Sequence, residues 1–217
     1  VRRMLTAKVL EAAKADLEAY KQAKVFAEEH NRLLRLAPDV RALKAEAIAA
    51  ALRSRPGVAE LKAAVEGMAI GAAGARLAVR LDLLEFDALP DEACVAGPTG
   101  AAFATLSIRE TCELQLANAC AASLRAALEV LQVAPFEAVE LVARICPPRG
   151  LTEAEMEPVL YLKIPRAALA KLDLRKVEAA SAATAFAARI DWAAERGLAP
   201  IAVDDLALAA VGLKAAA

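Results

Sequence analysis

The sequence predicts an all-α protein, an alanine-rich bundle of about seven or eight helices. Three observations support this prediction. Of the 217 residues, 59% are apolar but only 4% are aromatic, and alanine fills most of the difference. Alanine favours the helix most strongly, because it loses no side-chain entropy there and buries no polar group. Apolar residues also recur at three- and four-residue steps, and capping boxes and prolines mark the expected helix ends.

The first expected helix spans residues 4–37. Its apolar stripe follows the 3.6-residue period of a helix, while the charged residues fall largely on the other side. We expect Pro38 to end this helix and Asp39 to cap the next one. The stripe consists of Leu10, Ala13, Leu17, Tyr20, Ala23, Ala27 and Leu34.

Two further helices are expected over residues 40–54 and 58–86. Gly67, Gly71 and Gly74 lie in the second of these and weaken it by up to about 1 kcal/mol each relative to alanine. In a strongly helical context, such small residues let another backbone come close, and a kink is the competing explanation. The three glycines are therefore candidate interface residues on a small-residue helix face.

Residues 87–102 are the clearest break in the helical pattern, since they contain two prolines, two glycines and an acidic cluster. We interpret them as an exposed Pro/Gly loop that joins N-terminal helices, residues 1–86, to C-terminal helices, residues 103–217, within one compact unit. Acidic clusters can hold a cation, but a solvated loop is the commoner outcome. The acidic residues are Asp87, Asp91 and Glu92.

The second half of the chain begins with a capping box, Ser107 and Glu110, which opens the most strongly patterned helix, residues 108–132. Residues 159–164 are compatible with an extended segment before Pro165, but one such segment does not make a sheet. The remaining expected features are helices over 135–145, 166–172, 174–196 and 203–214, a second capping box at Thr152 and Glu155, and a helix C-terminus before Gly197.

The four cysteines are too few for a disulfide scaffold in a chain of this length. Cys112 and Cys120 lie on one apolar stripe of the helix over 108–132, so we expect both to be buried as small hydrophobic residues. Eight residues separate them by about 12 Å along a helix, too far for a disulfide or a shared metal ion. A pairing of either one with Cys94 or Cys146 stays open. The opposite helix face carries Thr111, Gln115, Asn118, Arg125 and Glu129.

Cys146 is the best candidate for a reactive thiol. The neighbouring Arg144 and Arg149 favour its thiolate, whereas the negative end of the preceding helix opposes it. Cys94 is a weaker candidate, because the carboxylates of the acidic loop raise the pKa of a nearby thiol.

Most catalytic constellations are missing from the sequence. His30 is the only histidine and lies in a charged helical stretch, so neither a catalytic triad nor a typical zinc site can be assembled. No phosphate loop or dinucleotide fingerprint occurs. The net charge of −1 argues against nucleic-acid binding, and no stretch is apolar enough for a transmembrane segment. We expect no cofactor and no metal, and a reducing compartment such as the cytoplasm or an organelle matrix.

These observations favour a non-catalytic α-helical structural or adaptor subunit, which packs against protein partners in a hetero-complex or a homo-oligomer. Trp192 and the three glycines are the candidate contacts, although a lone tryptophan is more often a packing anchor. The alternative is an enzyme or a small-ligand-binding bundle that uses Cys146 or a buried carboxylate. A third possibility is a homo-oligomeric, coiled-coil-like module built on the helix over 4–37.

Overall fold

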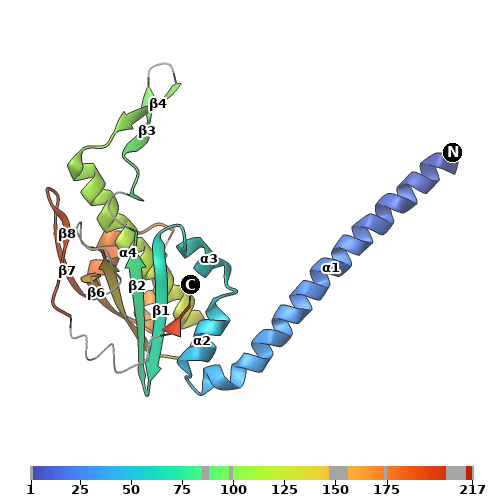
Figure 1. The fold of residues 1–217 in the computed structure, drawn as a ribbon, viewed down its shortest axis with the longest axis horizontal. Coiled ribbons are helices and arrows are strands. Elements are labelled where there is room, and N and C mark those ends of the chain that lie inside the picture. Colours follow the sequence, from blue (N-terminus) through green and yellow to red (C-terminus); the bar gives the residue numbers. More distant parts are fainter. Residues whose placement is uncertain are drawn as a thin grey trace. The chain divides into compact units, whose positions relative to one another are not determined.

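The computed structural model describes residues 2–84, 88–97, 100–146, 156–173, 175–203 and 214–216. The chain divides into two units, Val1–Pro38 and Asp39–Ala217. The predicted all-α helical bundle is wrong, because the second unit combines helices with a mixed β-sheet and a separate β-hairpin (Figure 1).

The first element is α1 (Arg2–Arg41), which confirms the first predicted helix. Pro38 does not end α1 but lies inside its last turns. The helix ends where the N–H groups of Leu43 and Lys44 each donate a 3.0 Å hydrogen bond to a carbonyl of the last turn. Leu43 has φ 59°, the left-handed conformation that commonly ends a helix. Asp39 accepts the bond from Lys44 and belongs to the end of α1, so it does not cap the next helix.

Two short helices follow, α2 (Ala45–Leu52) and α3 (Pro56–Leu61). The predicted helix over 40–54 is therefore only partly present. Pro56 is the first residue of α3, a position where its missing N–H costs no hydrogen bond. Both helices contribute apolar side chains to the core, among them Ile48, Leu52, Val58 and Leu61.

The predicted helix over 58–86 is wrong beyond α3. The chain forms an antiparallel pair instead, β1 (Val65–Ala73) and β2 (Arg76–Leu83), joined by a turn at Gly74 with φ +58°. Alanine and leucine fit a helix period and a strand period alike, and the alternation in β2, interrupted only by the apolar and buried Ala78, is the strand signal. The core-facing residues of β2 are Leu77, Val79, Leu81 and Leu83, and they alternate with Arg76, Ala78, Arg80 and Asp82.

The strand order of the main sheet is β8-β7-β6-β5-β2-β1-β9. The pair of β2 and β5 is parallel, and the other described pairs are antiparallel. A parallel pair needs a long crossover, which here contains the longest helix of the second unit, α4 (Ile108–Val133). The remaining strands are β5 (Ala138–Ile145), β6 (Glu157–Pro165), β7 (Ala187–Ala193), β8 (Gly197–Ala199) and β9 (Lys214–Ala215).

Several predictions for the C-terminal half need correction. The expected helix over 135–145 is β5, and the extended segment over 159–164 is confirmed within β6, where it does join a sheet. The expected helix over 174–196 is only α6 (Ala179–Thr184), followed by β7. Gly197 has a positive φ of 76°, but it follows a strand and a turn, not a helix. The predicted capping box at Thr152 and Glu155 and most of the predicted helix over 203–214 lie outside the described residues.

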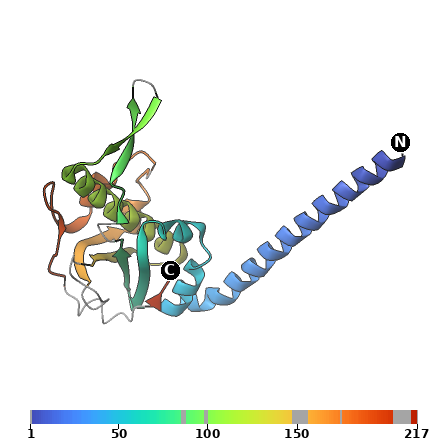
Figure 2. The same cartoon turned by 45° about the horizontal axis from the view of Figure 1, so that its top comes forward.

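The predicted helix over 108–132 is confirmed as α4, and so is its capping box. The Glu110 carboxylate accepts a 2.7 Å hydrogen bond from the Ser107 backbone N–H, and the Ser107 hydroxyl accepts one from the Glu110 N–H. The Ser107 hydroxyl also donates a 2.6 Å bond to the Glu110 carboxylate, and this bond, together with the one from the Ser107 N–H, lowers the pKa of the Glu110 carboxyl. Helix α4 covers one face of the sheet (Figures 1 and 2). The core between them includes Leu124, Ala127, Val130, Leu141, Leu160 and Leu162.

The C-terminal end of α4 is held by Arg166, the first residue of the short helix α5 (Arg166–Leu169). Its guanidinium donates three hydrogen bonds to carbonyl oxygens, at 2.5 Å to Leu131, 2.5 Å to Ala134 and 2.7 Å to Phe136. The last carbonyls of a helix have no partner within the helix. Arg166 therefore completes the end of α4 from a segment that is distant in the sequence.

The expected loop over 87–102 contains a β-hairpin, β3 (Glu92–Gly97) and β4 (Gly100–Thr105). The hairpin precedes α4 and stands away from the main sheet in both views (Figures 1 and 2). Every described residue of β4 is exposed. The exposure expected for this segment is therefore largely present, but a hairpin replaces the expected irregular loop from Glu92 onward.

Candidate protein-binding surfaces

Helix α1 carries large apolar side chains in contact with solvent. None of the side chains described between residues 8 and 38 is buried. The unit Val1–Pro38 contains no second element against which a helix could pack. Exposed apolar patches of this kind mark interaction sites in soluble proteins. The residues are Val9, Leu10, Leu17, Tyr20, Val25, Phe26, Leu33 and Leu34, and their exposure runs from 39% at Leu33 to 74% at Phe26.

A subset of these residues follows the spacing of a coiled coil. From Leu10 to Leu34, positions alternate by three and four residues, as in the a and d positions of a heptad repeat. Six of the eight positions are apolar, and the two exceptions are Lys24 and Asn31. We call this set the α1 seam: Leu10, Ala13, Leu17, Tyr20, Lys24, Ala27, Asn31 and Leu34.

The β3–β4 hairpin is a second exposed apolar surface, and the sequence interpretation missed it. No charged residue occurs from Ala93 to Ala104. Phe103 is 75% exposed and lies opposite Cys94 in the hairpin, and Val95 is 43% exposed. Two apolar segments around a Gly-Pro-Thr-Gly turn are a hairpin signal, which could have identified this element in the sequence.

The glycine face predicted as an interface does not exist as a helix face. Gly67 and Gly71 lie in β1, and Gly74 lies in the turn that follows. Gly71 is buried, and Gly67 lies opposite Asp82 of β2. The helix-packing argument for these residues is therefore wrong, because the segment is a strand. Their role as contacts stays an untested prediction.

Trp192 lies in β7 and anchors the β7–β8 hairpin to α4. Its indole N–H donates a 3.1 Å hydrogen bond to the carbonyl of Cys112. Beside it, the Gln115 side-chain oxygen accepts a 3.0 Å bond from the Leu198 N–H, and a Cβ at Gly197 would overlap that oxygen. These contacts favour the interpretation of Trp192 as a packing anchor.

Trp192 and the three candidate glycines do not form one surface. Strands β2, β5 and β6 separate β7, which carries Trp192, from β1.

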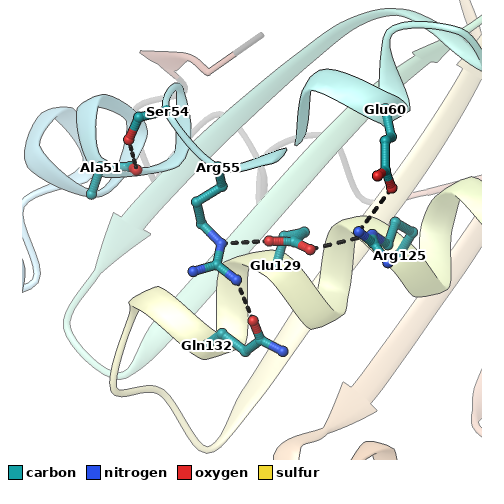
Figure 3. A network of polar contacts seen from close by, with 7 residues as sticks. All are labelled: Ala51, Ser54, Arg55, Glu60, Arg125, Glu129 and Gln132. Carbon is teal, nitrogen blue, oxygen red and sulfur yellow. Dashed lines mark hydrogen bonds and ion pairs between the residues drawn. The ribbon is translucent and has the colours of Figure 1, made fainter. Parts of the chain in front are cut away.

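The alternative function, an enzyme or a small-ligand-binding protein, was expected to use Cys146 or a buried carboxylate. Glu129 on α4 is a buried carboxylate, with 4% of its surface exposed. Figure 3 shows it between two guanidinium groups. Arg55 pairs with one carboxylate oxygen, and Arg125 lies 3.2 Å from the other. Arg55 also donates to Gln132, and Arg125 pairs with Glu60 of α3 at 3.0 Å. The carboxylate is thus engaged in joining α3 to α4.

The Glu129 network lies against the backbone of Gly57, and it covers part of a face of α4 that was expected to be exposed. A Cβ at Gly57 would overlap the Glu129 carboxylate, so glycine is needed there. The helix face that carries Gln115 and Glu129 was expected to be the polar one, opposite the core. Both residues are nevertheless buried, because α3 and the β7–β8 hairpin cover parts of this face.

None of the four cysteines forms a disulfide, and they differ in environment. Cys112 and Cys120 are buried in α4, which confirms their interpretation as core residues. Burial raises the pKa of Cys112, and it raises the pKa of Cys120 to about 11. Cys94 is exposed in β3, and Cys146 is half-buried after β5. No pairing between cysteines forms, so the open alternative of a disulfide is not realised.

We expect the thiols to differ in their alkylation rates. At pH 8, a thiol with a pKa near 11 is ionised in about one molecule per thousand, so Cys120 should react only after unfolding. Cys94 is exposed and should react without unfolding. Peptide mapping after timed iodoacetamide treatment measures all four sites. If Cys146 reacts no faster than Cys94, its proposed role as a catalytic thiol is excluded.

Two sequence expectations concern metal ligands and membrane-spanning helices, and the described part of the chain shows neither. His30 is exposed on α1 and stacks on Phe26, with ring centroids 6.4 Å apart. Within the described ranges, no group of three or more His, Cys, Asp and Glu side chains is arranged to hold a metal ion. None of the described helices has the length and hydropathy required to cross a bilayer. Of the acidic cluster, Asp91 and Glu92 are exposed, and Asp87 lies outside the described residues.

Comparison of the chain with models of protein families, with curated proteins and with solved structures finds no match.

Proposed function

We propose that this protein is a non-catalytic structural or adaptor subunit that binds a protein partner through α1. The observation that supports the proposal is the row of exposed apolar side chains on a helix with nothing to pack against in its own unit. Burying one leucine side chain contributes about 1.5–3 kcal/mol, so a partner that covers several of them gains enough for stable association. In this proposal, α1 binds the partner and thereby connects the α/β unit to the assembly.

The composition suits a protein partner in a reducing compartment. The net charge of −1 offers no general attraction for the phosphates of a nucleic acid. The free thiols are compatible with the cytoplasm or an organelle matrix, where cysteines remain reduced.

The double substitution Leu10→Glu and Leu17→Glu tests the proposal. Two charges in the apolar row should weaken association at least about 100-fold, because each removes a buried leucine and would bury a carboxylate. Thermal unfolding of the α/β unit should be unchanged. Native mass spectrometry and sedimentation equilibrium of the full chain measure the assembly.

The matched control is Ala12→Glu with Ala19→Glu, which places the same charges at the same spacing outside the α1 seam. This control should leave association intact. A wild-type chain that is monomeric at micromolar concentration and retains no specific partner would contradict the proposal. Equal effects of the two double variants would contradict it as well.

A further inference from the structure

We propose that the partner of α1 is α1 of a second copy of this chain, in an antiparallel pair with Leu10 opposite Leu34 of the partner subunit. This inference rests on the proposed function and specifies its partner. The α1 seam spans 24 residues, about 36 Å of helix. A heptad repeat drifts around a straight helix and keeps a continuous seam when two helices coil around each other with a left-handed supercoil.

The antiparallel alignment matches side-chain sizes across the seam. In this register, the numbers of two facing residues add up to 44. Leu17 therefore lies opposite Ala27 of the partner subunit, so that a large residue faces a small one. Leu10 and Leu34 of the partner subunit close each end of the seam. Ala13 faces Asn31 of the partner subunit, which leaves room for the amide at the edge of the seam. Alternation of large and small residues is how facing helices interdigitate.

Lys24 decides the orientation. In a parallel pair, the Lys24 ammonium would face its own copy within the seam, and like charges in a buried position are unfavourable. In the antiparallel pair, Lys24 faces Tyr20 of the partner subunit. The lysine stem can pack on the aromatic ring, and the ring face attracts the ammonium. Both residues are largely exposed in the single chain and therefore available for this contact.

One kind of charge pair beside the seam is attractive in this orientation, while Lys21 flanks Lys21 of the partner subunit at the centre and a parallel pair would place Asp16 beside Lys21 of the partner subunit, so the orientation depends on Lys24. In the antiparallel alignment, Lys14 flanks the seam next to Glu28 of the partner subunit, and symmetry repeats the pair. In a parallel pair, these two residues would instead face Val9 and Ala23 of the partner subunit, which offer no charge. Complementary flanking charges set partner choice and orientation in coiled coils.

Distances between spin labels distinguish the arrangements in the full chain. Labels are placed at Glu11→Cys or Gln22→Cys, both on the outer side of α1, after Cys94→Ser and Cys146→Ser remove the accessible thiols. Residue 22 lies at the centre of the seam, so its labels should be close in either orientation. Residue 11 lies opposite residue 33 of the partner subunit, so its labels should be about 33 Å apart along the axis.

A short distance at residue 22 with a long one at residue 11 supports the proposal. Short distances at both positions show a parallel pair and overturn it. Absence of dipolar coupling at residue 22 shows that α1 does not pair with its copy, which also overturns it. If the chain is then monomeric but retains a different protein that Leu10→Glu with Leu17→Glu releases, the proposed function stands and this inference alone fails.

A charge exchange provides an independent test. Lys14→Glu or Glu28→Lys alone should raise the dimer dissociation constant about three- to tenfold, since each turns two attractive pairs into repulsive ones. The chain with both substitutions should return to within about twofold of the wild type, because the exchanged charges attract again. Sedimentation equilibrium measures the constants. Additive weakening in the double variant contradicts the antiparallel pairing.

Discussion

Replacing Arg166 by alanine is expected to lower the free energy of unfolding by about 4 kcal/mol, because hydrogen bonds to a charged group contribute about 1.5–3 kcal/mol each and water replaces part of them. The guanidinium donates to the carbonyls of Leu131, Ala134 and Phe136, and the Ala134 carbonyl also accepts a 2.9 Å bond from the Phe136 N–H. The alanine variant loses all three bonds from the guanidinium at the end of α4. Urea unfolding followed by the fluorescence of Trp192, the single tryptophan, measures the change.

Two variants control this experiment. Arg166→Lys keeps the charge but presents one ammonium in place of a planar fork, so it should recover only about half of the loss. Arg109→Ala removes an arginine from the exposed side of the same helix, where its side chain is 71% exposed and pairs with Glu113, and should cost less than about 0.5 kcal/mol. A loss at Arg166→Ala as small as that at Arg109→Ala would show that the three hydrogen bonds do not hold α4.

Replacing Glu129 by alanine is expected to lower the free energy of unfolding by about 3 kcal/mol, the lower end of the range for breaking a buried ion pair. The lower end applies because Arg55 and Arg125 are 32% and 41% exposed and can regain water. The change also removes the central carboxylate of the network between α3 and α4 in Figure 3, while the contacts of Arg125 with Glu60 and of Arg55 with Gln132 remain. Hydrogen exchange of α3 should accelerate together with the loss of global stability.

The matched control is Glu113→Ala on the same helix, where the carboxylate is 49% exposed and pairs only at the surface. It should cost less than about 0.5 kcal/mol. Glu129→Gln keeps the shape of the side chain but removes its charge. If its loss of unfolding free energy lies between the losses of Glu129→Ala and Glu113→Ala, the contribution of the ion pairs is separated from that of packing. Equal losses for Glu129→Ala and Glu113→Ala would contradict the structural role of the network.

The two long helices were predictable because their signals are local. The capping box of Ser107 and Glu110 satisfies backbone groups within one turn, and the periodic stripe of α4 extends over more than 20 residues. The α1 stripe is equally regular. For the same reason, the burial of Cys112 and Cys120 followed from their positions on the α4 stripe.

The sheet was not predictable in this way. Strands such as β1 and β5 consist of eight or nine mostly apolar residues, and a window of that length fits a buried helix and a buried strand alike. What distinguishes them is the pairing of β2 with β5, whose residues lie more than 50 positions apart in the sequence. The apolar surface on α1 was predictable from the sequence. The β3–β4 hairpin that carries Phe103 was not recognised, because its turn residues suggested a loop.

The sequence by itself determined where the helices α1 and α4 lie, that the thiols of α4 are core residues, and that α1 carries an unpaired apolar stripe. These properties depend on neighbours within a few turns of the chain, which the amino-acid order specifies directly. Only the tertiary structure decided that alanine-rich segments pair as strands, that Glu129 is buried between two arginines, and that Arg166 completes the end of α4. Each of these depends on a contact between distant segments, whose free energy exists only once the chain has brought them together.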